Sequence, residues 1–201
     1  MQLLSNTTSP YGRIARIAMI EKSFNVEPTI VDPWADDPRL RAANVASRVP
    51  TLILDDGTAL TESLLIVQWL EHTRPTPSLL GDNPGKVTEI AGVALGVIDA
   101  SIHTLITRKV TAPVLFDETP IGLRRRRTMA EGLARLESLI DESSLTKQTG
   151  TPTLDIIAAI VAIDYLRFRF PDATWMPVTP LLDKLSKEWR ARASFEITTP
   201  R

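Results

Sequence analysis

The amino-acid sequence predicts a small α/β domain followed by an all-helical domain. In the first part of the chain, short strand-like and helix-like segments alternate, in an order typical of a small mixed sheet that carries helices. Residues 75–84 then contain three prolines and a glycine, a composition typical of a linker. Beyond this stretch only helical patterns follow. We therefore expect an N-terminal domain over residues 1–76, a linker over 77–85 and an all-helical domain over 86–201.

The first three elements are expected in the order strand, helix, strand. Residues 2–5 form a short apolar segment that predicts the first strand. From Tyr11 onward, apolar residues recur at helical spacing, and Pro10 fits the first helical turn, where its missing N–H costs no hydrogen bond. Residues 27–31 predict the second strand.

A hairpin and a helix complete the N-terminal domain. Residues 33–41 form a polar loop with one helical turn. The strand over 50–54 starts on a proline, which strands tolerate at that position, and the Asp-Asp-Gly turn at 55–57 leads to a short return strand at 59–60. Residues 62–72 then predict a helix with a regular apolar spacing.

The second domain contains four predicted helices, over residues 86–110, 121–140, 154–170 and 180–191. The third of them is apolar on all sides from Ile156 to Ile163, which is typical of a central, buried helix. Thr153 is its expected N-cap.

Composition excludes several classes of function. The chain has 201 residues, no cysteine, two histidines and a formal net charge of -1. Without cysteine there is no disulfide, no cysteine-ligated zinc and no cysteine nucleophile, and two histidines form no metal cluster. The balanced charge argues against nucleic-acid binding. Neither a signal peptide nor an apolar run long enough to span a membrane is evident, so we expect a cytoplasmic protein without a membrane partner.

Four motifs lie along the chain: Thr-Ser-Pro-Tyr at 8–11, Arg-Val-Pro-Thr-Leu at 48–52, Leu-Thr-Glu-Ser at 60–63 and Trp-Arg-Ala-Arg-Ala-Ser-Phe at 189–195. In this order, and over essentially the whole chain, the sequence resembles the glutathione S-transferase family. The resemblance implies a thioredoxin-like N-terminal domain followed by an all-helical C-terminal domain. It also implies glutathione as co-substrate.

The resemblance further implies that the peptide bond between Val49 and Pro50 is cis. Such a turn would leave the backbone N–H and C=O of Val49 free to pair with an extended peptide in the manner of a strand, and glutathione is such a peptide. The simpler alternative is that the Val-Pro pair merely begins a strand.

Glu62 and Ser63 are expected at the start of a helix, where free N–H groups and the helix dipole attract anions. Ser63 would bind the γ-glutamyl carboxylate of glutathione, and Glu62 its ammonium group. Alternatively, Thr61 is the N-cap and Glu62 stabilises the first turn. Arg48 would reach the glycyl carboxylate or the backbone of the tripeptide, or it is simply an exposed arginine at a strand edge.

Ser9 is the candidate catalytic residue. Because glutathione brings its own thiol, with a pKa of about 8.5 when free, the protein needs only a donor that favours the thiolate. A hydroxyl beside a helix N-terminus supplies one, although a serine before a proline is also a common helix cap. Tyr11, which we also count among the binding residues, ranks second as donor, and Thr8 third. A serine here, in place of cysteine, argues against thiol exchange.

The resemblance implies a glutathione transferase whose thiolate attacks a small, mostly apolar electrophile held by the helical domain. The alternative is a non-catalytic, glutathione-binding stress or interaction protein with the same fold. The family resemblance also implies a homodimer, formed through the outer helix of the first domain and residues 86–110. Arg124 to Arg127 point in different directions around a helix, so we expect them to be solvated surface and not a nucleic-acid site.

Overall fold

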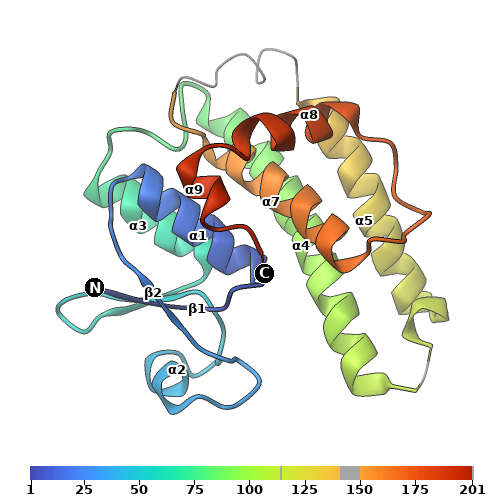
Figure 1. The fold of residues 1–201 in the computed structure, drawn as a ribbon, viewed down its shortest axis with the longest axis horizontal. Coiled ribbons are helices and arrows are strands. Elements are labelled where there is room, and N and C mark those ends of the chain that lie inside the picture. The colour runs from blue at the N-terminus through green and yellow to red at the C-terminus, as the bar shows by residue number, and fades with distance from the viewer. Residues whose placement is uncertain (114, 141–149, 201) are drawn as a thin grey trace. The chain divides into compact units, whose positions relative to one another are not determined.

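The computed structural model describes residues 1–113, 115–140 and 150–200 (Figure 1). Contacts divide the chain into two compact units, Met1–Leu79 with Arg190–Arg201, and Leu80–Trp189. The first boundary falls inside the proline-rich stretch. The final residues belong to the N-terminal unit, whereas the sequence placed them in the helical domain, because they pack against the first helix of the chain.

The N-terminal unit is built on a four-stranded sheet with the order β2-β1-β3-β4. Its strands are β1 Gln2–Ser5, β2 Pro28–Ile30, β3 Thr51–Ile53 and β4 Ala59–Thr61. β1 and β2 are parallel, since α1 (Pro10–Glu21) crosses over between them, whereas β1 with β3 and β3 with β4 are antiparallel. The predicted order of elements and the thioredoxin-like sheet are confirmed.

Helices cover both faces of this sheet. In Figure 1, α1 and α3 (Ser63–Thr73) lie together on one face and α2 (Pro38–Ala43) lies on the other. Successive side chains of β1 point to opposite faces of the sheet, as in any β-strand. Leu4 packs in a cluster with Leu40 of α2, while Leu3 lies beside residues of α1, and all three leucines are fully buried.

In the described residues of the second unit, the regular secondary structure is all helical, as predicted. It contains α4 Pro84–Thr111, a 3-10 turn η1 Phe116–Glu118, α5 Pro120–Leu139, α7 Leu154–Arg169 and α8 Pro180–Trp189. α4 packs against both α5 and α7. Residues 157–163 of α7 are each at most 1% exposed, which confirms the central, buried helix. Thr153 is its N-cap residue, but the side chain makes no capping hydrogen bond.

α4 is long and apolar enough to cross a membrane by length and composition alone. Its polar residues interrupt every apolar run, which is why the sequence showed no such segment. Nine of its residues are buried, and the helix packs against α5 and α7. A place in the core of the helical unit accounts for its composition.

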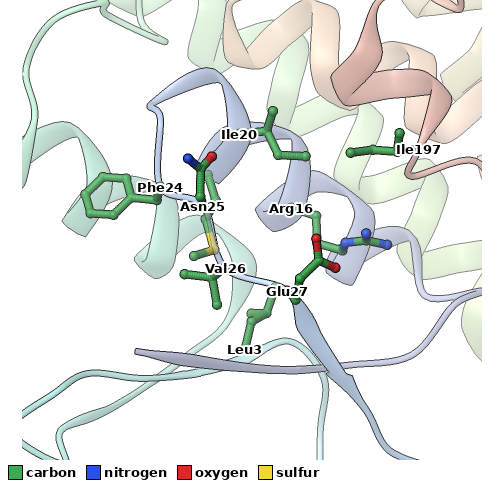
Figure 2. A pocket seen from close by; sticks show the side chains of 9 residues that line it. Leu3, Arg16, Ile20, Phe24, Asn25, Val26, Glu27 and Ile197 are labelled. Atoms are coloured by element: carbon green, nitrogen blue, oxygen red, sulfur yellow. The ribbon is translucent and has the colours of Figure 1, made fainter.

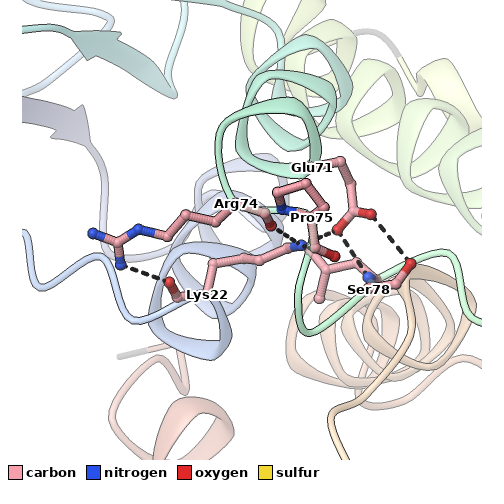
Figure 3. Close-up of polar contacts among 6 residues, drawn as sticks. Lys22, Glu71, Arg74, Pro75 and Ser78 are labelled. Atoms are coloured by element: carbon pink, nitrogen blue, oxygen red, sulfur yellow. Dashed lines mark hydrogen bonds and ion pairs between the residues drawn. The ribbon is translucent and has the colours of Figure 1, made fainter.

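A buried lysine joins the end of α1 to the end of α3 (Figure 3). The Lys22 side chain is fully buried, donates to the carbonyl oxygen of Arg74 at 2.6 Å and forms an ion pair with Glu71. Glu71 accepts a hydrogen bond from the backbone N–H of Leu79 at 2.8 Å, and the Arg74 guanidinium donates to the Lys22 carbonyl at 2.9 Å. Because a buried charge is stable only with such partners, this network fixes α1, α3 and the start of the linker together.

The C-terminal segment is tied to α1 by a second polar cluster. Its short helix α9 (Ala193–Glu196) packs on α1. Arg192 donates two hydrogen bonds of 2.6 Å to the carboxylate of Glu21, and the hydroxyl of Ser194 adds a third at 2.5 Å. The bonded carboxylate of Glu21 raises the pKa of Arg192.

Candidate active site

The strand register brings three of the four motifs to one end of the sheet. Leu4 of β1 lies opposite Thr51 of β3, and Thr51 lies opposite Thr61 of β4. Because β3 is antiparallel to both neighbours, the end of β1, the start of β3 and the end of β4 lie side by side, about 4.8 Å apart from strand to strand. The loop after β1, the Val-Pro pair before β3 and the Glu-Ser pair after β4 therefore share one edge of the unit.

Ser9 is the N-cap of α1, with extended backbone angles of φ −73° and ψ 120°. Its Oγ accepts a hydrogen bond from the backbone N–H of Gly12 at 3.1 Å, and its own N–H donates to the carbonyl of Asn6 at 3.2 Å. Toward the described residues the Ser9 hydroxyl acts only as an acceptor, so its proton is not engaged. The capping role is confirmed, and it leaves the hydroxyl able to donate to a ligand.

Thr8, the third-ranked donor, holds the loop instead. Its hydroxyl and its backbone N–H both donate to Oδ1 of Asn6, each at 3.0 Å. Asn6 is anchored in turn by a bond of 3.3 Å from its Nδ2 to the carbonyl of Val31. Asn6 was not among the predicted site residues, although an asparagine two residues before such an N–H is a known turn signal. Tyr11, the second-ranked donor, is half-buried in the first turn of α1.

Gly12 lets the chain pack tightly behind Ser9. A Cβ atom at this position would lie 2.5 Å from Oγ of Ser5 and 3.3 Å from Cβ of Ser9. The Ser5 hydroxyl is buried and has no hydrogen-bond partner among the described residues. Gly12 was not among the predicted site residues, yet a glycine within a helix costs about 0.5–1 kcal/mol relative to alanine, which is a signal of a packing constraint.

The peptide bond between Val49 and Pro50 is cis, as the resemblance implied. β3 begins only at Thr51, and among the described residues no hydrogen bond engages the backbone N–H or C=O of Val49. The Val49 side chain is half-buried against the core cluster that contains Leu4. The Val49 backbone is thus unpaired at the end of the sheet, as the functional interpretation requires.

A buried asparagine holds this turn in place. Nδ2 of Asn44 donates to the carbonyl of Arg48 at 3.1 Å and to Oγ1 of Thr51 at 3.2 Å. The Thr51 hydroxyl also donates to the Arg48 carbonyl, at 2.9 Å. Asn44 was not among the predicted site residues, because only the folded turn shows that its amide spans both sides of the Val-Pro pair.

Glu62 precedes α3 in a strained conformation. The helix begins at Ser63, and Glu62 occupies the N-cap position with φ of +64°. Thr61 belongs to β4, so the alternative in which Thr61 caps the helix is wrong. A non-glycine residue at such an angle costs about 1–3 kcal/mol, and strain of this kind gathers at binding sites. Ser63 is buried, and no side chain caps α3. The first backbone N–H groups of the helix are therefore able to donate hydrogen bonds to an anion.

Arg48 and Glu62 meet above this helix start. Nη1 of Arg48 lies 3.7 Å from Oε1 of Glu62, and the two side chains are 72% and 59% exposed. An ion pair this exposed contributes little to stability, typically about 0.2–1 kcal/mol, so a charged ligand can replace it at small cost. Arg48 and Glu62 were predicted to act at different groups of the tripeptide, and the structure brings the two side chains together.

The chain is similar to known proteins. A family model for "Glutathione S-transferase, N-terminal domain" matches residues 3–78. The uncharacterized GST-like protein YibF of Escherichia coli (strain K12) is 29% identical over 203 residues, which cover 100% of this chain and 98% of YibF. A maleylacetoacetate isomerase of Pseudomonas aeruginosa is 30% identical over 144 residues, 68% of this chain and 66% of that protein.

A solved structure extends the likeness to the whole fold. A glutathione S-transferase from Methylobacterium radiotolerans JCM 2831, crystallised with glutathione sulfonate, superposes with a TM-score of 0.85. It is 30% identical in sequence, and the match covers 99% of this chain and 94% of that one. With its motifs gathered at one end of a thioredoxin-like sheet, this chain belongs to the glutathione S-transferase family.

Proposed function

We propose that this chain binds glutathione at the end of the sheet where β1, β3 and β4 meet. The unpaired backbone of Val49 offers strand-like hydrogen bonds to the tripeptide. The uncapped N-terminus of α3 at Ser63 suits the γ-glutamyl carboxylate, and the carboxylate of Glu62 suits the neighbouring ammonium group. Arg48 is available to the glycyl end. The glutathione derivative bound by the relative from Methylobacterium radiotolerans supports this choice of ligand.

In the proposed mechanism, Ser9 donates a hydrogen bond to the glutathione sulfur and keeps it ionised. A free thiol with a pKa of about 8.5 is mostly protonated at neutral pH. Lowering that pKa by two units requires about 2.7 kcal/mol of preferential stabilisation of the thiolate. A hydrogen bond to a charged group contributes about 1.5–3 kcal/mol, and a helix N-terminus adds about 0.3–1 kcal/mol. The unengaged proton of Ser9, at the start of α1, is the observation that carries this proposal.

The thiolate then reacts with a second substrate. In conjugation, its sulfur forms a bond to carbon in a small, mostly apolar electrophile and the leaving group departs. A second candidate, isomerisation, is favoured by the similarity to a maleylacetoacetate isomerase. There the thiolate adds to a double bond, permits rotation and leaves again. Both reactions begin from the same ionised sulfur, so the Ser9 role is common to them.

The test compares the wild type with Ser9→Ala and Ser9→Thr. For the wild type we expect the pKa of bound glutathione, followed by the ultraviolet absorbance of the thiolate, to lie below its free value. Ser9→Ala should raise that pKa and lower kcat/KM at neutral pH by about 10- to 100-fold, in line with loss of one hydrogen bond to a charged group. Ser9→Thr retains the hydroxyl and should retain much of the activity.

Two assays separate the candidate functions. Conjugation of glutathione to an aryl halide and isomerisation of maleylacetoacetate should each be measured, with Ser138→Ala, an exposed serine of α5, as the matched control. Calorimetric binding of glutathione without turnover in either assay would favour the non-catalytic alternative. Absence of glutathione binding would refute the proposed ligand itself.

A further inference from the structure

The N-terminal unit contains a pocket of about 250 Å³ that is separate from the candidate active site (Figure 2). Apolar side chains form most of its wall, among them Leu3, Ile20, Phe24 and Val26. Leu3 pairs with Pro28 where β1 and β2 begin, which is the opposite end of the sheet from the Val-Pro and Glu-Ser pairs. The pocket and the proposed glutathione site therefore occupy different ends of the same sheet.

One cationic side chain, that of Arg16, is among those that line the pocket. Arg16 lies on α1, seven residues after Ser9 and thus about 10 Å farther along the helix axis. Arg16 is half-buried, and its guanidinium makes no hydrogen bond or close ion pair with the described residues. Burial lowers the pKa of Arg16, although arginine stays charged at neutral pH. A guanidinium with five N–H donors in such a place favours an anionic partner, because water solvates the group only in part.

Glu27 is the one acidic side chain in the wall of the pocket, and it is exposed. Figure 2 shows its carboxylate on the same side of the pocket as the Arg16 guanidinium. Its charge acts on Arg16 from a distance and raises the pKa of that group, opposing the effect of burial. Glu27 thus offsets the positive charge of Arg16 only in part, and it accepts no hydrogen bond from the Arg16 guanidinium.

The size and lining of the pocket define the ligand. Its volume of about 250 Å³ lies just below the range of about 300–1000 Å³ that is common for drug-sized molecules, so the ligand is compact. A pocket lined by six apolar side chains, by Asn25 and Glu27 and by one guanidinium suits a molecule with an apolar body and one carboxylate, because a planar carboxylate matches the two-pronged geometry of arginine. A phosphate would leave most of its oxygens against apolar side chains.

We infer that this pocket is a binding site for a compact monocarboxylate, with an aromatic ring or a short aliphatic chain against Phe24 and Val26 and its carboxylate on Arg16. The site is additional to the proposed glutathione site and does not depend on it.

The probes are 3-phenylpropionate, its primary amide and 3-phenylpropylamine. Binding is measured by calorimetry with glutathione present, so that the carboxylate does not compete at the start of α3, and methyl resonances of Ile20 and Val26 report its location. We expect saturable binding of the carboxylate, with the amide and the amine at least about tenfold weaker. Equal binding of the carboxylate and the amide would overturn the inference, as would the absence of saturable binding.

Variants place the ligand on these residues. Arg16→Met keeps the apolar stem and should weaken the binding of 3-phenylpropionate by at least about tenfold. Glu27→Gln removes a negative charge beside Arg16 and should strengthen that binding. Ile197→Trp should block the pocket, since Ile197 lines it and is 54% exposed, so the chain tolerates a larger side chain there. Arg135→Met, which removes one positive charge from the helical unit, should leave the affinity for 3-phenylpropionate unchanged. If Arg16→Met fails to fold, unaltered affinity in both Glu27→Gln and Ile197→Trp would still refute the site.

Discussion

The space around position 12 shows how one missing Cβ atom shapes the candidate active site. An alanine there would approach Oγ of Ser5 to 2.5 Å. The buried serine must move, or α1 must shift and carry Ser9 with it. We expect Gly12→Ala to lower the free energy of unfolding by about 1–3 kcal/mol, the usual cost of overpacking, and to reduce glutathione turnover. Urea denaturation and steady-state kinetics measure the two effects.

Two companion variants make the interpretation specific. Gly96 is exposed on α4, and a Cβ atom there would have no atom within 4 Å apart from its chain neighbours and the adjacent helix backbone. Gly96→Ala should therefore stabilise the chain by up to about 1 kcal/mol. Adding Ser5→Ala to Gly12→Ala removes the colliding oxygen and should restore part of the lost stability. Full wild-type stability and activity in Gly12→Ala alone would contradict the packing argument.

At the scale of elements, the Lys22 network decides how α1 and α3 are joined. Lys22→Met would leave the carboxylate of Glu71, whose side chain is only 15% exposed, without its ammonium partner. Breaking one side of a buried ion pair costs about 3–5 kcal/mol. We expect a loss of this size in urea denaturation. The exposed pair of Lys86 and Glu89 provides the control, and Lys86→Met should cost less than about 1 kcal/mol.

A double variant separates the ion pair from the packing. Lys22→Met with Glu71→Gln removes both charges, so it should be more stable than Lys22→Met alone, because no uncompensated carboxylate remains. If the double variant is no more stable than Lys22→Met, the loss comes instead from the hydrogen bonds to the carbonyl groups of Arg74 and Pro75, which both variants lack.

Elements with a strong local pattern could be predicted from the sequence, and those set by distant contacts could not. β1, α1 and α7 follow from apolar periodicity and from proline at a helix start. The four-residue helix α9 is too short to show a period, and its place is set by Glu21, far away in the chain. The positive φ of Glu62 has no signal in its residue type, because it results from the tight connection between β4 and α3.

The same limit applies to the candidate site. Ser9 could be named because a motif and a helix start coincide there. Asn44 and Gly12 act by filling or leaving space around such residues, and their roles become visible only when β1, α1 and β3 are packed together. The pocket at Arg16 is a still clearer case, since its wall combines β1, α1 and Ile197 near the C-terminus.

For the molecule as a whole, the outer surface of α3 bears on the oligomeric state. Leu64 and Leu65 are 42% and 55% exposed on this helix, where the expected homodimer would form. We expect light scattering with size-exclusion chromatography to give the mass of a dimer for the wild type and of a monomer for Leu65→Arg. Leu115→Arg, at a 69% exposed position near η1, should remain dimeric. A monomeric wild type would contradict the proposed dimer.

The return of the C-terminal segment to the N-terminal unit makes the fold of that unit depend on both ends of the chain. A chain that ends at Trp189 would lose the fully buried side chain of Phe195 together with the Arg192 and Ser194 partners of Glu21, at a cost of about 3–5 kcal/mol. Arg192→Met keeps the rest of the segment and should cost about 1.5–3 kcal/mol, against less than about 1 kcal/mol for the exposed control Arg135→Met. Urea denaturation measures all three. Because Ile197 also lines the pocket at Arg16, the truncated chain should lose carboxylate binding even at temperatures where it stays folded. Unchanged stability of the truncated chain would mean that α1 keeps its place without the polar cluster at Glu21.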